Sequence, residues 1–388
     1  MAITPVSSIN FVSAKAVEDK KVTNPIKTAA PAVENKAPEA GALRAYFMGG
    51  NAVSFSGFPV STGGFVTKKI DDVPCCCCGG RMVRAGEMDK KAREFSGIKG
   101  EKLADKITED KDFFRAPQRV VMMLAADEAR KHPNYDLTAA KNAAGKGLKE
   151  KTQNYCINSL READTAVKAA YGEKNPTSQI IAEEIEKLNK GQINRQGFTD
   201  KLVAQQGSLD PVTYEKVMAA AMDMPIDFSE VKKAFGQAGG SATSIAKSLL
   251  KQSTQTIEHI HPKSLGGPNA TQNFIAECGD CNWPRGNSSY LQWLKVHPEY
   301  PLKAQDHIEW FQQQVVDGKI DSRYDDYGID VKKTLSKETN GQIELKVLNP
   351  EKIKELREAK KAGQDVNVSE IIAEEYGEKK PEKEEEVA

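Results

Sequence analysis

The stretch from Thr256 to Leu294 constrains the fold and the chemistry of this chain more than any other. It brings together two histidines, acidic residues, amide side chains and a Cys-x-x-Cys pair. Such a composition is typical of a metal site placed beside a proton-transfer group. The local pattern predicts a strand over 256–260, a Gly-Gly loop and a second strand over 273–276. After the cysteine pair it predicts a helix that begins near Asn287, so the expected unit is a ββα-metal arrangement.

Several short motifs follow one another in this stretch. In chain order they are Glu258-His259-Ile260-x-Pro262, Gly266-Gly267, Asn273-Phe274, Cys278-x-x-Cys281-Asn282 and Arg285-Gly286. Their order and spacing resemble those of the HNH endonucleases, although the resemblance covers only this part of the chain. It implies an α+β fold class with a small ββα-metal HNH core.

The resemblance also implies which residues carry the catalysis. His259 corresponds to the general base that takes a proton from water, a role that suits an imidazole near neutral pH. Glu258 and Asn282 correspond to the oxygen ligands of a catalytic divalent cation, Mg²⁺ or Mn²⁺. Asn273 corresponds to the middle letter of the motif and is expected to hold the loop and orient the histidine.

Three more residues are expected to contact nucleic acid. Arg285 is expected at the start of a helix, where it would contact the scissile phosphate with the help of the helix dipole. Lys263 is expected to contact a neighbouring phosphate. His261 is either a further phosphate contact or a structural residue.

The cysteines predict a second, structural metal site. Six of the seven fall in two tight clusters, which favours metal binding in a reducing compartment over a disulfide scaffold. Four consecutive cysteines cannot all reach one ion, but the first and fourth form a Cys-x-x-Cys-Gly turn. By the resemblance, one structural Zn²⁺ is bound by Cys75, Cys78, Cys278 and Cys281. A register shift could substitute Cys76 or Cys77 for either upstream ligand.

The rest of the chain suggests a large insertion between the two cysteine clusters. Residues 88–250 have a helical pattern that predicts five to seven short helices. The expected division is a disordered leader (1–66), an upstream zinc knuckle (67–83), an all-helical insertion (84–252), the HNH core (253–298), C-terminal helices with a short β segment (299–362) and a charged C-terminal tail (363–388).

Composition limits the partners. The chain has 55 basic and 55 acidic residues, so nucleic acid would be contacted through a local patch and not through the whole surface. The first residues lack the pattern of a secretory signal, and no apolar run approaches the roughly 20 residues needed to cross a bilayer. We therefore expect a cytoplasmic protein without a membrane partner.

The resulting hypothesis is a metal-dependent HNH endonuclease that hydrolyses phosphodiester bonds in DNA, with double-stranded DNA as the expected partner. One alternative is a non-catalytic, zinc-stabilised module that only binds nucleic acid. Another is a nuclease toxin. The sequence does not distinguish DNA from RNA as the substrate, or nicking from double-strand cleavage, and it leaves the sequence specificity and the oligomeric state open.

Overall fold

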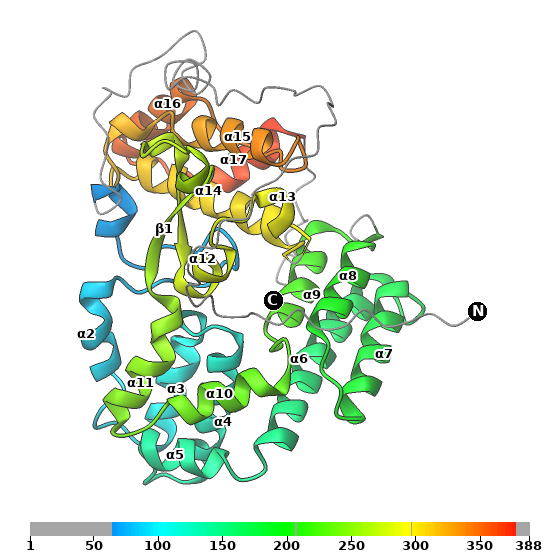
Figure 1. Cartoon of the computed structure of the whole chain (residues 1–388). Coiled ribbons are helices and arrows are strands. Elements are labelled where there is room, and N and C mark those ends of the chain that lie inside the picture. The colour runs from blue at the N-terminus through cyan, green and yellow to red at the C-terminus, as the bar shows by residue number, and fades with distance from the viewer. Residues whose placement is uncertain (1–63, 206–207, 296, 378–388) are drawn as a thin grey trace, which may run out of the picture. The chain divides into compact units, whose positions relative to one another are not determined.

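The computed structural model describes residues 64–377, apart from 206–207 and 296 (Figure 1). Most of the leader predicted for residues 1–66 lies outside the described residues. At its end, however, Phe65 is fully buried, and its ring centroid lies 5.7 Å from that of Phe274. The predicted boundary at residue 66 is therefore too late in the chain.

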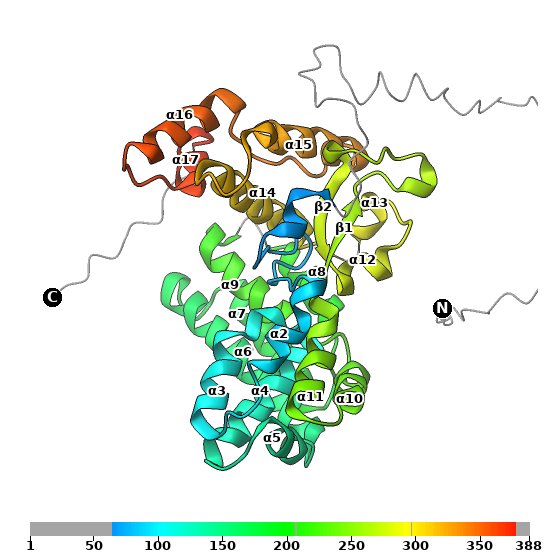
Figure 2. The same ribbon diagram turned by 90° about the vertical axis from the view of Figure 1, so that its left-hand side faces the viewer.

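The sheet consists of the two strands that the sequence predicts, each displaced by one or two residues. The core elements are β1 (Gln255–His259), β2 (Phe274–Cys278), α12 (Gly279–Arg285) and α13 (Tyr290–Trp293). The strands lie side by side (Figure 2). They pair antiparallel, with His259 opposite Phe274. The single helix predicted from Asn287 is replaced by α12 and α13. Gly286, at φ 52°, ends the first helix, and Ser289 caps the second with a capping box.

Between residues 88 and 250 the described residues form ten α-helices, so the prediction of five to seven is wrong. They are α2 (Met88–Arg93), α3 (Gly100–Glu109), α4 (Ala116–Lys131), α5 (Leu137–Ala144), α6 (Leu148–Tyr171), α7 (Pro176–Asn189), α8 (Arg195–Val203), α9 (Pro211–Met222), α10 (Phe228–Gln237) and α11 (Ala242–Leu250). The junction of α5 and α6 shows why. The chain there turns at Gly147, at φ 71°, and only the two glycines at 145 and 147 mark the boundary, without a proline or an aspartate, in a stretch otherwise rich in helix-forming residues.

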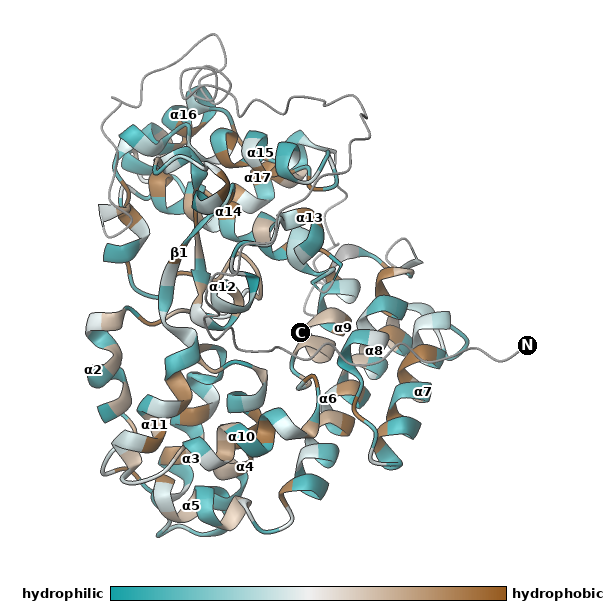
Figure 3. Ribbon diagram, viewed as in Figure 1, coloured by the Kyte–Doolittle hydropathy of each residue, from teal (hydrophilic) through white to brown (hydrophobic). Residues whose placement is uncertain are grey.

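The helices of this region enclose two hydrophobic cores. Phe95, Phe114 and Val121 belong to the first core, which is formed by α2–α5, α10 and α11. The second core is formed by α6–α9 and contains Phe198. Hydrophobic and hydrophilic residues accordingly occupy different faces of these helices (Figure 3). Tyr155 on α6 packs against both cores and links them.

The C-terminal part is helical throughout its regular structure. Its helices are α14 (Tyr300–Val316), α15 (Tyr327–Glu338), α16 (Pro350–Lys361) and α17 (Val368–Glu375). The prediction that residues 363–388 form only a charged tail is wrong for α17, where Ile372 is buried. Residues 378–388 of that tail lie outside the described residues. Among the described helices, none combines the length and apolar character needed to cross a membrane.

Residues 342–347 do not form the predicted β segment. Gln305 on α14 accepts from the Lys346 N–H (2.8 Å) and donates to its carbonyl (2.9 Å). Gln312, two turns later, accepts from the Leu348 N–H (3.2 Å) and donates to its carbonyl (2.9 Å). Two side-chain amides thus take the place of a partner strand. Apolar and polar residues alternate in this segment because it is extended and lies against α14, so that every second side chain is buried.

His307 on α14 joins the C-terminal helices to the upstream cysteine turn. The side chain is fully buried, and its Nδ1–H donates to the Pro74 carbonyl at 2.8 Å. Its Nε2 is buried without a hydrogen-bond partner among the described residues. Burial lowers the pKa of His307 from 6.5 to about 4, although the bond to Pro74 opposes this shift. The folded protein therefore holds this imidazole neutral.

This histidine should make folding stability depend on pH. The unfolded chain takes up a proton near pH 6.5 and the folded chain only near pH 4, so stability is complete above pH 6.5 and falls between these values. We expect His307 to contribute a loss of about 2 kcal/mol between pH 7 and pH 5. Denaturant unfolding of wild type and of His307→Asn at both pH values gives the free energy of unfolding, and the difference between the two losses is the contribution of His307. Equal losses in the two proteins would contradict the assignment.

Candidate functional site

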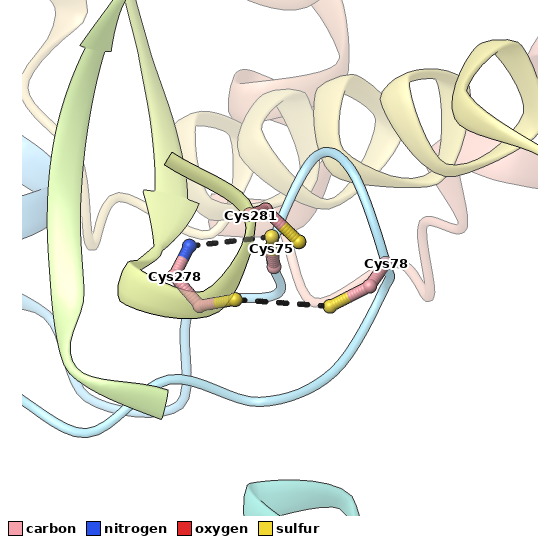
Figure 4. Close-up of side chains that lie close together, drawn as sticks. All are labelled: Cys75, Cys78, Cys278 and Cys281. Carbon is pink, nitrogen blue, oxygen red and sulfur yellow. Dashed lines mark hydrogen bonds between the residues drawn. The ribbon is translucent and has the colours of Figure 1, made fainter. Parts of the chain in front are cut away.

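Four cysteines from distant parts of the chain come together at the end of the sheet (Figure 4). Their sulfur atoms all lie within 4.8 Å of one another, and the members are Cys75, Cys78, Cys278 and Cys281. The Sγ atoms of Cys78 and Cys278 are 3.9 Å apart. Zinc bound tetrahedrally by four thiolates at about 2.3 Å places neighbouring sulfurs about 3.8 Å apart. The group could therefore hold one zinc ion with sulfur in all four positions.

Local backbone turns place these thiols. Gly79, at φ 71°, reverses the chain so that its N–H bonds to the Cys75 carbonyl at 2.8 Å. The Cys75 N–H in turn donates to the Gly80 carbonyl at 3.0 Å. On the other side, Cys278 is the N-cap residue of α12, and its N–H donates to Cys75 Sγ at 3.3 Å. A backbone N–H aimed at sulfur favours the thiolate, the form that binds metal.

The two inner cysteines of the run have other partners. Cys76 Sγ lies 3.5 Å from Glu277 Oε1. Cys77 Sγ accepts a hydrogen bond from Trp293 Nε1 at 3.4 Å. Burial raises the pKa of Cys77 to about 12, which keeps this thiol protonated at neutral pH. The four-cysteine group thus contains the first and fourth cysteines of the run, and the register shift that the sequence allowed is not needed.

Glu277 is a residue of this site that sequence analysis missed. It is fully buried in β2, and its Oε1 accepts from the Tyr290 hydroxyl at 2.9 Å. Burial raises the pKa of its carboxyl to about 7. Its bond to Tyr290 fixes α13 against the strand that ends at Cys278. The sequence did contain a sign of this role: Glu277 is an acidic residue within an otherwise apolar strand. A carboxyl in such a position requires a buried partner.

His259 lies at the end of β1, half-buried. Its Nε2 is 3.2 Å from Asn269 Oδ1, and its ring meets Phe274 edge-on with centroids 5.0 Å apart. Burial lowers the pKa of His259 below 6.5, and the charge of Lys263 adds to this, whereas the bond to Asn269 opposes it. The imidazole is therefore neutral at pH 7, the state in which it can accept a proton.

Glu258 and Arg285 form a buried ion pair between β1 and α12. Glu258 is 6% exposed and Arg285 only 1%. The guanidinium also donates to the His259 carbonyl at 2.8 Å and to the Ser288 carbonyl at 2.5 Å. It lies 4.4 Å over the ring of Tyr290. Arg285 thus ties together the strand and the helix that carry the predicted catalytic residues.

The expected position of Arg285 is wrong. It is the last residue of α12, not the first residue of a helix, so the positive end of the helix dipole lies away from it. Because Arg285 is buried and paired with Glu258, its charge faces the protein interior and not the surface. The error arose because the sequence pattern gave no sign that a helix begins at Gly279, inside the cysteine pair.

Asn273 holds the loop that carries the two glycines. It is fully buried, immediately before β2. Its amide nitrogen donates to the carbonyls of His261 and Pro268, each at 2.9 Å, and its Oδ1 accepts from the His261 N–H at 2.7 Å. A Cβ at Gly267 would lie 1.9 Å from the His261 carbonyl oxygen, so only glycine fits there. The Asn273 side chain therefore closes the loop, and the loop requires glycine at residue 267.

The remaining predicted residues differ in their surroundings. Asn282 is half-buried on α12, one residue after the cysteine pair, and Lys263 is exposed in the loop after β1. His261 is not free. Its Nδ1 is 3.1 Å from Glu338 Oε1 on α15, and its Nε2 is 3.1 Å from the Leu265 carbonyl. These contacts favour the structural role for His261 over a phosphate contact.

Comparison with known proteins identifies one family. The family model of the HNH endonucleases matches residues 246–288, from within α11 to just before α13. This match confirms the resemblance seen in the sequence, and it indicates nuclease activity in general, a hydrolase that acts on nucleic acid. No curated protein and no solved structure matches the chain significantly.

The cysteine geometry predicts which thiols hold zinc. Cys278→Ser removes one of four ligands. Because structural zinc binding amounts to about 10–16 kcal/mol in small zinc proteins, loss of one ligand should weaken affinity about 100-fold or more. Cys78→Ser should behave in the same way. Competition with a chromogenic chelator measures the affinity.

Cys77→Ser provides the matched control, because it alters a buried cysteine next to Cys78 that bonds to Trp293 and, although it also interacts with Cys281, lies outside the four-sulfur group. Zinc affinity close to wild type is expected for this variant. If Cys77→Ser lost zinc while Cys78→Ser kept it, the assignment of the first and fourth cysteines would be wrong.

Proposed function

We propose that this protein is a metal-dependent endonuclease that hydrolyses phosphodiester bonds in DNA. The observation that carries the proposal is a neutral, half-buried His259 at the end of β1, which follows Glu258 in the chain, on a strand that contacts α12, the helix that carries Asn282. The family match to the same residues supports it.

His259 is the proposed general base. The Asn269 side-chain oxygen, Oδ1, can only accept a hydrogen bond. Its contact with Nε2 of His259 therefore assigns the ring proton to Nε2 and leaves the lone pair on Nδ1. Nδ1 would take the proton of the attacking water. Phe274 packs against the ring and limits its rotation, which keeps the base in one orientation.

Glu258 and Asn282 are the proposed ligands of the catalytic cation. Both offer oxygen donors, which Mg²⁺ and Mn²⁺ prefer, and both lie where β1 and α12 meet. The Arg285 guanidinium pairs with Oε1 of the Glu258 carboxylate. The donor set therefore fits a hard divalent cation. When bound, such a cation stabilises the negative charge that develops on the phosphate oxygens.

The surrounding residues support this centre. Asn273 holds the glycine loop and with it the chain that leaves His259. Lys263, exposed on that loop, is the proposed contact for a neighbouring phosphate. Arg285 acts on Glu258 in this account and does not contact the substrate. The four cysteines bind structural zinc, which leaves no open position for catalysis.

A second candidate function, a module that binds nucleic acid without cutting it, is favoured by one observation. The Glu258 carboxylate is 6% exposed and already paired with a cation. If that pair excludes a divalent cation, the domain would retain the fold and the zinc but not the chemistry.

Cleavage of supercoiled plasmid DNA tests the proposal. Purified protein with Mg²⁺ or Mn²⁺ should convert the plasmid to nicked or linear forms. His259→Ala should lower the rate by about 10²- to 10⁴-fold, the usual contribution of a general base. His132→Ala is a matched control, because His132 is exposed in the helical region. It should cleave like wild type.

Equal cleavage by wild type and His259→Ala would refute His259 as the base. Absence of DNA cleavage, with zinc bound and DNA retained in a gel-shift assay, would support the binding module. Cleavage of RNA but not DNA would keep the nuclease and correct its substrate.

A further inference from the structure

Arg115 lies against the upstream cysteine turn although it belongs to the helical region. It is the N-cap residue of α4, and only 3% of it is exposed. Its Nη2 donates to the carbonyls of Gly80 (3.4 Å) and Arg81 (2.8 Å), which follow Cys78 closely. A Cβ at residue 80 would lie 1.6 Å from Nη1 of this arginine. Glycine at this position therefore makes room for the guanidinium.

This buried cation has no acidic partner of the ordinary kind. Among the described residues, no carboxylate forms an ion pair with it, and its Nε and Nη1 are buried without hydrogen-bond partners. Asp280 lies near enough to feel its charge but makes no ion pair with it. An uncompensated buried charge is strongly destabilising, so a negative group must balance it.

The four cysteines provide that negative charge. All four lie close enough for their charges to act on the guanidinium. Four thiolates around one Zn²⁺ carry a net charge of −2, and a neighbouring guanidinium reduces it to −1.

We infer that Arg115 is a positioning residue of the zinc site, which compensates the charge of the zinc-bound thiolates and fixes the turn that carries Cys78. Residues that bond around a metal site commonly set its affinity in this way. The helical region thereby supplies a functional part of the metal centre. The inference rests on the proposed zinc site and does not depend on nuclease activity.

Zinc affinity of two Arg115 variants tests the inference. Arg115→Gln removes the charge, and Arg115→Lys keeps it while losing the forked geometry. We expect Arg115→Gln to bind zinc about 10- to 100-fold more weakly, as is usual when such a surrounding residue is lost. Arg115→Lys should stay within a few-fold of wild type. Chelator competition on the full chain gives each affinity without reference to DNA cleavage.

Arg119→Gln is the matched control. Arg119 lies one turn further along α4 and pairs with Asp223 inside the helical region. Its loss should weaken folding without changing zinc affinity. If Arg115→Gln bound zinc as tightly as wild type, or if Arg115→Lys and Arg115→Gln lost zinc equally, the charge would not be what matters and the inference would be overturned.

Two further results keep the test decisive. If Arg115→Gln does not fold, Gly80→Ala replaces it, because the added methyl group displaces the guanidinium from its position. Zinc affinity about tenfold lower in Gly80→Ala, with Arg115→Lys near wild type, supports the inference, and wild-type affinity in Gly80→Ala overturns it. Wild-type protein that binds no zinc would overturn the zinc site itself, and this outcome is separate from any result on cleavage.

Discussion

The contact on which the rest of this structure depends is the meeting of two cysteine pairs that lie 200 residues apart in the chain. Closing so long a loop costs conformational entropy, although the cost grows only slowly with loop length. Backbone contacts contribute to the closure, since the Cys76 N–H donates to the Ala276 carbonyl and Val83 forms a parallel bridge with Thr254. A metal ion shared by both pairs would supply the main closing interaction, and so permits a large helical region to lie between them.

The same contact positions the chemistry through a short sheet. Cys278 ends β2, and Phe274, at the other end of that strand, lies opposite His259. Arg285 then locks α12 to β1 through the Glu258 carboxylate and the His259 carbonyl. A strand pair and one buried guanidinium thus hold His259, Glu258 and α12 in a fixed relation. Catalytic groups need this kind of preorganisation, because small displacements reduce rates strongly.

Sequence predicted the local features well, and among the long-range ones it predicted the meeting of the two cysteine pairs. The strands, the loop closed by Asn273 and the cysteine pairs follow from short motifs whose spacing is set by backbone geometry. The ion pair of Arg285 could not be predicted, because it depends on where α12 begins. The segment that ends at Leu348 alternates like a strand, yet two glutamine side chains bind its backbone. Arg115 gave no signal, since a basic residue before a helix is ordinarily exposed.

The central claim is that one zinc ion, held only by sulfur, joins the two cysteine pairs. X-ray absorption at the zinc edge on the purified full chain tests it most directly. We expect one zinc per chain with four sulfur neighbours at about 2.3 Å and no nitrogen or oxygen ligand. A mixed shell that includes histidine nitrogen or carboxylate oxygen, or a chain that retains no zinc, would contradict it.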